Sequence, residues 1–131
     1  MKEKWLENAK DGNLKEMKEI YRRLRSKGLL QEVKNFKDYS GLNALMKATW
    51  KGHLNICQWL VREDLVAVNS KDKWGLNALH MAARYNQPEI AKLLLEETSI
   101  DVNDQDNDGW TALHTAFIWN YPEVTRILLE Y

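Results

Sequence analysis

The strongest constraint on the fold is a segment that occurs three times along the chain, with an offset of 34 residues each time. The copies begin at Asp38, Asp72 and Asp106, and each continues with a glycine three positions later and a leucine four positions after that. Self-similarity at a fixed period of this length is typical of solenoids, in which one structural unit is repeated and stacked. We therefore expect a stacked array of similar units.

Each unit is expected to form a turn, a short helix and a longer helix. Asp hydrogen-bonds its own following backbone and Gly accepts a positive φ, so the Asp-x-x-Gly opening favours a turn. In the third unit, apolar residues at helical spacing predict a first helix that begins at Asn77 or Ala78 and a second that begins near Pro88. One helix pair cannot bury two apolar faces alone, so the units must stack. The turn glycines are Gly41, Gly75 and Gly109.

The core of the unit resembles the ankyrin repeat, whose usual pattern is Thr-Pro-Leu-His followed by Ala-Ala. The matching segments are "NALMKA" at 43–48, "NALHMAA" at 77–83 and "TALHTA" at 111–116. The segment "VNDQD" at 102–106 is similar to the Val-Asn connection of the family. The resemblance covers about residues 38–131 and implies a mainly α fold, an ankyrin-type solenoid of helix pairs with β-hairpin or turn connections.

The first unit is a degenerate version of this pattern. Residues 8–24, "NAKDGNLKEMKEIYRRL", resemble the helix pair, with Gly12 in the place of Gly52. These glycines are 40 residues apart instead of 34, so we expect about six extra residues in the linker. The chain is then a single ankyrin-repeat domain, 1–131, with approximate units 1–37, 38–71, 72–105 and 106–131.

Two kinds of departure from the family pattern leave the helix boundaries intact. Asn43 and Asn77 replace the usual threonine, and asparagine caps a helix start equally well. Asn86 and Asn120 stand where glycine is usual, and asparagine is the next most tolerant of the left-handed conformation. We expect helices to begin and end at these positions.

Residue types that carry catalysis or bind metals are expected to be structural. His80 and His114 occupy the same repeat position, and the resemblance implies that each bonds backbone near its turn. Cys57 is expected to be a small buried residue, because the sequence supplies no histidine partner that would activate it. His53 is expected to be exposed. These residues predict a protein that is not an enzyme and needs no cofactor, metal or small-molecule substrate.

Asp104, Asp106 and Asp108 alternate ahead of a glycine, a spacing that also opens an EF-hand calcium loop. An EF-hand requires glutamate at its twelfth position, where this chain has Thr115. Asp106 recurs in the other copies as a turn residue, which favours turn chemistry. A weak surface cation site is the alternative.

The resemblance implies that partners bind a concave surface formed by the turn tips and the exposed face of the first helices. This surface carries an unusual number of large apolar and aromatic residues, the types that dominate interface hot spots. A protein or peptide partner is therefore expected. Its candidate contacts are Tyr39, Leu42, Trp50, Lys51, Trp74, Leu76, Arg84, Tyr85, Trp110, Ile118 and Trp119. Alternatively, Leu42, Leu76 and Trp110 pack against adjacent turns. Ile118 and Trp119 would then only shield the end of the stack.

Other functions stay open. The chain can be the scaffold segment of a larger multidomain protein or enzyme. The basic run "YRRLRSK" at 21–27 can contact nucleic acid, although the same run fits the polar cap of a terminal repeat. Asn103 is similar to the sites at which asparaginyl hydroxylases modify ankyrin domains, with a structural asparagine as the alternative.

The last repeat keeps its apolar pattern to the final "RILLEY". We expect either a longer array or an end covered by a partner or second copy, so both a monomer and end-to-end association fit. Residues 1–37 hold eleven Lys/Arg against six Asp/Glu, and this basic start opposite an acidic finish favours head-to-tail contacts. With no secretory signal, no apolar run near ~20 residues and one cysteine, we expect no membrane insertion and a cytoplasmic or nuclear location.

Overall fold

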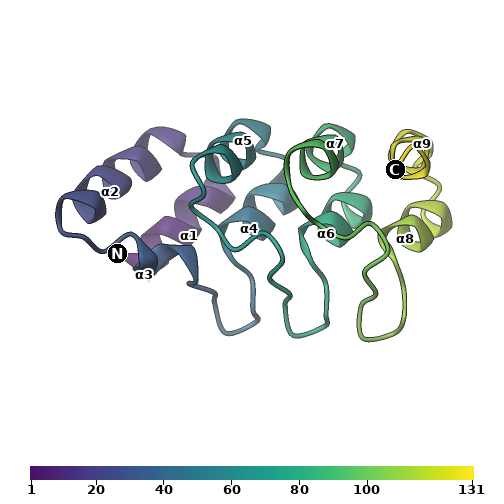
Figure 1. Cartoon of the computed structure of the whole chain (residues 1–131), viewed down its shortest axis with the longest axis horizontal. Helices are drawn as coiled ribbons and strands as arrows, with labels where there is room; N and C mark the ends of the chain where they lie inside the picture. The colour runs from purple at the N-terminus through teal and green to yellow at the C-terminus, as the bar shows by residue number, and fades with distance from the viewer.

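Pairs of antiparallel helices stack side by side along the whole chain in the computed structural model, which describes residues 1–131 (Figure 1). The helices α1, α4, α6 and α8 form one row, α2, α5, α7 and α9 form a second row, and the turns project from the first row (Figure 1). No helix is both long and apolar enough to cross a membrane. The bounds are α1 Lys2–Asp11, α2 Leu14–Ser26, α3 Gln31–Lys34, α4 Ala44–Lys51, α5 Leu54–Arg62, α6 Ala78–Arg84, α7 Pro88–Glu97, α8 Ala112–Ile118 and α9 Pro122–Leu129.

Helix boundaries follow the local signals in the sequence. The helix α6 begins directly after Asn77, whose Oδ1 accepts the backbone N–H of His80 at 2.9 Å. The helix α7 begins at Pro88, which needs no N–H partner there. Between the helices of their units, Asn86 and Asn120 adopt φ values of 56° and 57°. The predicted helix starts and left-handed asparagines are confirmed.

One apolar core runs the length of the stack. Leu45 and Leu79 occupy equivalent positions and are fully buried, whereas the equivalent Leu113 is only partly buried because α8 and α9 form the last layer. Small residues at one shared position let the first helices pack closely. These residues are Ala48, Ala82 and Ala116.

The extra residues between the first and second units contain α3, which the sequence pattern does not predict because four residues are too few for a helical periodicity. Val33 on this helix is buried in the core. A second difference concerns His53, which is half-buried and not exposed as expected. Its Nε2 lies 2.8 Å from the carbonyl oxygen of Lys10, and its ring lies against Gly12. This contact joins the first two units.

The connections between units are turns that contain no β-strand, and the helix-pair solenoid is confirmed with turns as its links. In the third unit, the Oδ1 of Asp72 accepts the N–H groups of Trp74 and Leu76, both at 2.9 Å. Neighbouring turns are also bonded to each other, since the N–H of Asn107 donates to the carbonyl of Trp74 at 3.0 Å. Gly75 faces this junction with φ 80°.

The imidazole of His80 joins its helix start to the next turn. Its Nδ1 accepts the backbone N–H of Asn77 at 3.0 Å, so its Nε2 carries the proton and donates to the carbonyl of Asp104 at 2.9 Å. Burial lowers the pKa of His80 below its ordinary value, against the opposing effect of the Asp104 carbonyl and nearby carboxylates. The structural role predicted for His80 therefore rests on two backbone groups, the N–H of Asn77 and the carbonyl of Asp104.

We expect the free energy of unfolding to fall as the pH drops through the ordinary pKa of histidine, 6.5, because of His80. The folded pKa lies below the unfolded value, so the contribution is present above the unfolded pKa and is lost as the pH falls toward the folded one. Urea denaturation at several pH values gives the free energy of unfolding as a function of pH. This free energy should fall less steeply with falling pH in His80→Gln than in the wild type. His114→Gln, at the exposed equivalent position, serves as control. Equal slopes for the wild type and His80→Gln would contradict this assignment.

Candidate functional site

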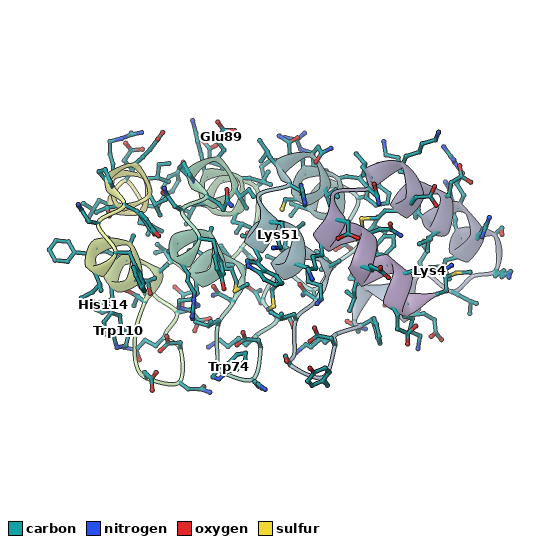
Figure 2. The ribbon with its side chains drawn as sticks, turned by 180° about the vertical axis from the view of Figure 1, so that it is seen from behind. Lys4, Lys51, Trp74, Glu89, Trp110 and His114 are labelled. Carbon is teal, nitrogen blue, oxygen red and sulfur yellow. The ribbon has the colours of Figure 1, made fainter.

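A groove lies on the concave side of the stack, between the turns of the second, third and fourth units and the first helices of the second and third. Its volume is about 440 Å³. Trp74 lies among the turn tips, and Lys51 lies at the level of the first helices (Figure 2). We call this hollow the concave groove, and its lining residues are Leu42, Trp50, Asp72, Trp74, Leu76, Met81, Arg84, Tyr85, Asp106 and Asp108.

The floor of the concave groove is a small apolar cluster separate from the main core. Met46, Leu76 and Met81 are buried together, and Leu42 and Trp50 pack against them. Leu76 is only 9% exposed and lies at the bottom of the groove, which favours the alternative that it packs against its neighbours. The reason is that the turn directs Leu76 onto two methionines, which fill irregular space well. The floor is therefore firmly packed.

Aromatic rings stand at the edge of this floor. The rings of Trp50 and Tyr85 have centroids 6.2 Å apart at an interplanar angle of 44°, a tilted contact. Lys51 Nζ lies 4.4 Å from the Trp50 ring centroid, and Lys73 Nζ lies 4.5 Å from that of Trp74. Such cation–π contacts contribute only about 0.5–1 kcal/mol at exposed sites, so a partner can displace them.

Carboxylates of the third and fourth turns complete the lining. In the second unit, Lys47 Nζ lies 2.8 Å from Asp38. Burial alone would raise the pKa of Asp38, but the bonds from Lys47 and from the Leu42 N–H hold it below its ordinary value. One and two repeats later, the position of Lys47 holds Met81 and Thr115. The equivalent turn carboxylates, which line the groove, therefore lack this lysine; they are Asp72 and Asp106.

The structure brings together about half of the predicted contact residues. Six of them line the concave groove, namely Leu42, Trp50, Trp74, Leu76, Arg84 and Tyr85. Tyr39 is almost fully exposed on the first turn. Trp110, Ile118 and Trp119 line a third hollow together with Leu76 and Arg84, and Trp110 and Ile118 also line a hollow at the end of the stack. Sequence reasoning missed Met81 and the turn carboxylates. The sequence does contain a signal for both: Met81 replaces Lys47 at the same repeat position, so the turn carboxylate of the third unit has no lysine beside it.

Two of the three alternating aspartates, Asp104 and Asp106, take different partners. Asp104 binds Lys71 Nζ at 2.8 Å and Asn77 Nδ2 at 3.2 Å. The Oδ1 of Asp106 accepts the backbone N–H groups of Asp108 and Trp110, both at 2.9 Å. The carboxylate of Asp106 acts as a turn group, as the repeat pattern indicates, whereas that of Asp104 links two units through Lys71 and Asn77.

The other residues that the sequence singles out as possible reactive, modified or nucleic-acid-binding positions do not line the groove. Cys57 is buried, and burial raises the pKa of its thiol to about 12, which keeps it protonated and unreactive. Asn103 is exposed in the last connection, with its N–H bonded to Asp101 Oδ1 at 2.9 Å. Hydroxylation of Asn103 stays a prediction. Arg23 and Arg25 are exposed on α2, on the first unit.

Comparison with known families agrees with this geometry. A family model described as "Ankyrin repeats (3 copies)" matches residues 63–131, which is more than half of the chain. A second, described as "Ankyrin repeat", matches residues 40–73. No curated protein gives a significant match. The stacked helix pairs, the bonded turns and these matches agree, and the chain belongs to the ankyrin-repeat family.

Proposed function

We propose that the concave groove binds a segment of a partner protein, with Trp74 and Tyr85 as its main contacts. Ankyrin repeats generally serve as protein–protein interaction modules and are typically not catalytic. The observation that carries the proposal is the pairing of exposed aromatic rings with a rigid floor. Trp74 is 53% and Tyr85 37% exposed, beside the packed Leu76. Aromatic side chains next to a preformed apolar hollow dominate binding energies.

The charges around the groove restrict the partner further. Lys51, Lys73 and Arg84 present cations beside the aromatic rings, while Asp106 and Asp108 present carboxylates toward the fourth unit. A segment with an apolar anchor and charges of both signs would find complementary groups on either side of that anchor. Such complementarity contributes more to specificity and association rate than to affinity.

The test compares two folded double variants in affinity capture from host lysate. Trp74→Ala with Tyr85→Ala removes the exposed rings, whereas Glu89→Ala with Lys92→Ala alters exposed residues of α7. Glu89 lies at the opposite edge of the stack from the turns (Figure 2). Trp50 stays intact because its ring packs on the buried cluster.

We expect the affinity of the aromatic double variant for its partners to fall at least about tenfold, since two such rings contribute more than ~1.4 kcal/mol together. The amount of partner captured should fall accordingly. The α7 double variant should capture them as the wild type does. Identical partner sets for all three proteins would disprove the role of the groove. Capture that collapses between about 50 and about 200 mM salt would favour phosphate contacts of the basic α2 instead.

A further inference from the structure

The outer face of the last helix pair is a second hollow, with a volume of about 620 Å³. It lies at the end of the stack formed by α8 and α9 (Figure 1), where Trp110 and His114 are placed (Figure 2). We call this surface the end face. It is lined by Asp108, Gly109, Trp110, Leu113, His114, Phe117, Ile118, Thr125 and Leu129.

Groups that contact the next unit elsewhere in the stack contact no further unit on the end face. An added Cβ at Gly75 would lie 2.8 Å from the backbone N of Asn107, whereas at the equivalent Gly109 it would meet nothing within 4 Å. His80 reaches the carbonyl of the next turn, but His114 bonds only within its own turn, at Thr111. The face thus has the character of an inter-unit surface.

The end face nevertheless differs from the inner junctions at one position. Thr49, Ala83 and Phe117 occupy the same position in the second, third and fourth units. Thr49 and Ala83 are each 0% exposed, whereas Phe117 is 74% exposed. Phe117 lines the end face, so the same position in the third unit faces α8 across the junction. A phenylalanine ring does not fit where a threonine or alanine fills the space. A further unit in the same geometry would clash with Phe117.

Charge indicates what covers the face. Its centre carries no charged side chain, and Asp108 is the one charged residue among its lining groups. Two identical faces can therefore meet without close like-charge repulsion. The opposite end of the stack differs, because Met1 and Leu29 are its exposed large apolar residues among many charged ones. An apolar face against that charged end would be mismatched, which argues against the head-to-tail contact expected from net charge.

The apolar area suits a dimer of ordinary size. Four large apolar residues of the face are exposed, namely Trp110, Phe117, Ile118 and Leu129. With about 150–250 Å² for an aromatic side chain and roughly the lower end of that range for an aliphatic one, their exposed parts amount to roughly 500 Å² per copy. Non-polar atoms make up about 60% of such interfaces, so this core corresponds to roughly 1,600 Å² buried by two copies together. Specific, stable complexes bury about that much.

We infer that the end face of one chain pairs with the end face of a second copy about a two-fold axis, with Phe117 of each copy inserted into the hollow of the other. An interface of this kind is isologous and closes at the dimer, whereas head-to-tail contacts would continue into longer chains. The main contacts proposed for the concave groove stay free in this dimer, because Trp74 and Tyr85 do not line the end face; Asp108 is the one residue that lines both hollows.

Sedimentation equilibrium of the 131-residue chain tests the inference. From about 1 to about 100 µM, we expect the mass to rise toward twice 15.4 kDa and to stop there. Phe117→Glu should raise the dissociation constant at least about 30-fold, the effect of losing one hot-spot residue. Leu129→Glu, on the other helix of the face, should act in the same direction. Trp74→Glu, an equally drastic change in the concave groove, should leave the dimer unchanged.

Circular dichroism establishes first that each variant is folded, and both altered end-face residues are exposed enough for this to be expected. A wild-type chain that is still monomeric at about 100 µM would overturn the inference. So would a mass that grows past the dimer, or a dimer that Trp74→Glu disrupts and Phe117→Glu does not. The first two outcomes leave the proposed function of the concave groove unaffected, whereas the third would make Trp74 part of the dimer contact.

Discussion

Gly75→Ala is expected to lower the free energy of unfolding by about 2–5 kcal/mol. Two costs add at this position. At φ 80° an alanine loses about 1–2 kcal/mol, because its Cβ approaches its own backbone. The same Cβ would lie 2.8 Å from the backbone N of Asn107, which holds the turn-to-turn hydrogen bond, so the neighbouring turn must shift. Overpacking of this kind costs about 1–3 kcal/mol.

Gly109→Ala isolates the first cost, since Gly109 has φ 82° and open space around it. We expect a loss of about 1–2 kcal/mol there. Both substitutions are best made in a Phe117→Glu chain, so that association contributes nothing, and measured by urea denaturation. Equal losses at the two glycines would mean that the turns do not constrain one another.

Ala83→Phe is expected to have the largest effect, a loss of more than about 3 kcal/mol in the free energy of unfolding. The ring would be forced into the junction between α6 and α8, where Ala83 is fully buried. In a one-dimensional array, stability depends on contacts between neighbouring units. We therefore expect the fourth unit to unfold first, which hydrogen exchange of α8 and α9 would detect as lost protection.

Arg84→Phe is the matched control, because it adds the same side chain one residue later at an exposed site. Its effect should stay within about 0.5 kcal/mol. If Ala83→Phe were as well tolerated as Arg84→Phe, the junction would have room for a large ring. The argument that Phe117 excludes a further unit would then fail.

The sequence predicts the repeated parts of this molecule best. An offset of 34 residues places Asn77, Pro88 and Asn86 at helix boundaries, and each takes the expected conformation because its effect is local. The helix α3 was not predicted, because it occurs once and no second copy reveals it. His53 was placed wrongly for a related reason, since its partner Lys10 belongs to the degenerate unit, where the register is hardest to read.

Tertiary packing distributes the predicted surface residues over adjoining hollows and the end of the stack. Trp74 and Tyr85 were expected on the concave side and do line its groove. Leu76 occupies an outward-facing position of the repeat, yet the turn curls it onto Met46 and Met81. Ile118 belongs to the same repeat position as Arg84 and lines one hollow with it, but it also contributes to the end face, because α8 has no helix beyond it. Repeat position specifies the backbone environment, and the layer in the stack decides which surface a side chain joins.

Phe117 also bears on how an array of this kind can lengthen. Tandem duplication of a gene segment copies a unit together with both of its surfaces. A copy of the third unit would carry Ala83 and stack without obstruction, whereas a copy of the fourth would place an aromatic ring inside a new junction. Growth of the gene by repetition would therefore have to start from an internal unit, or follow replacement of that one codon.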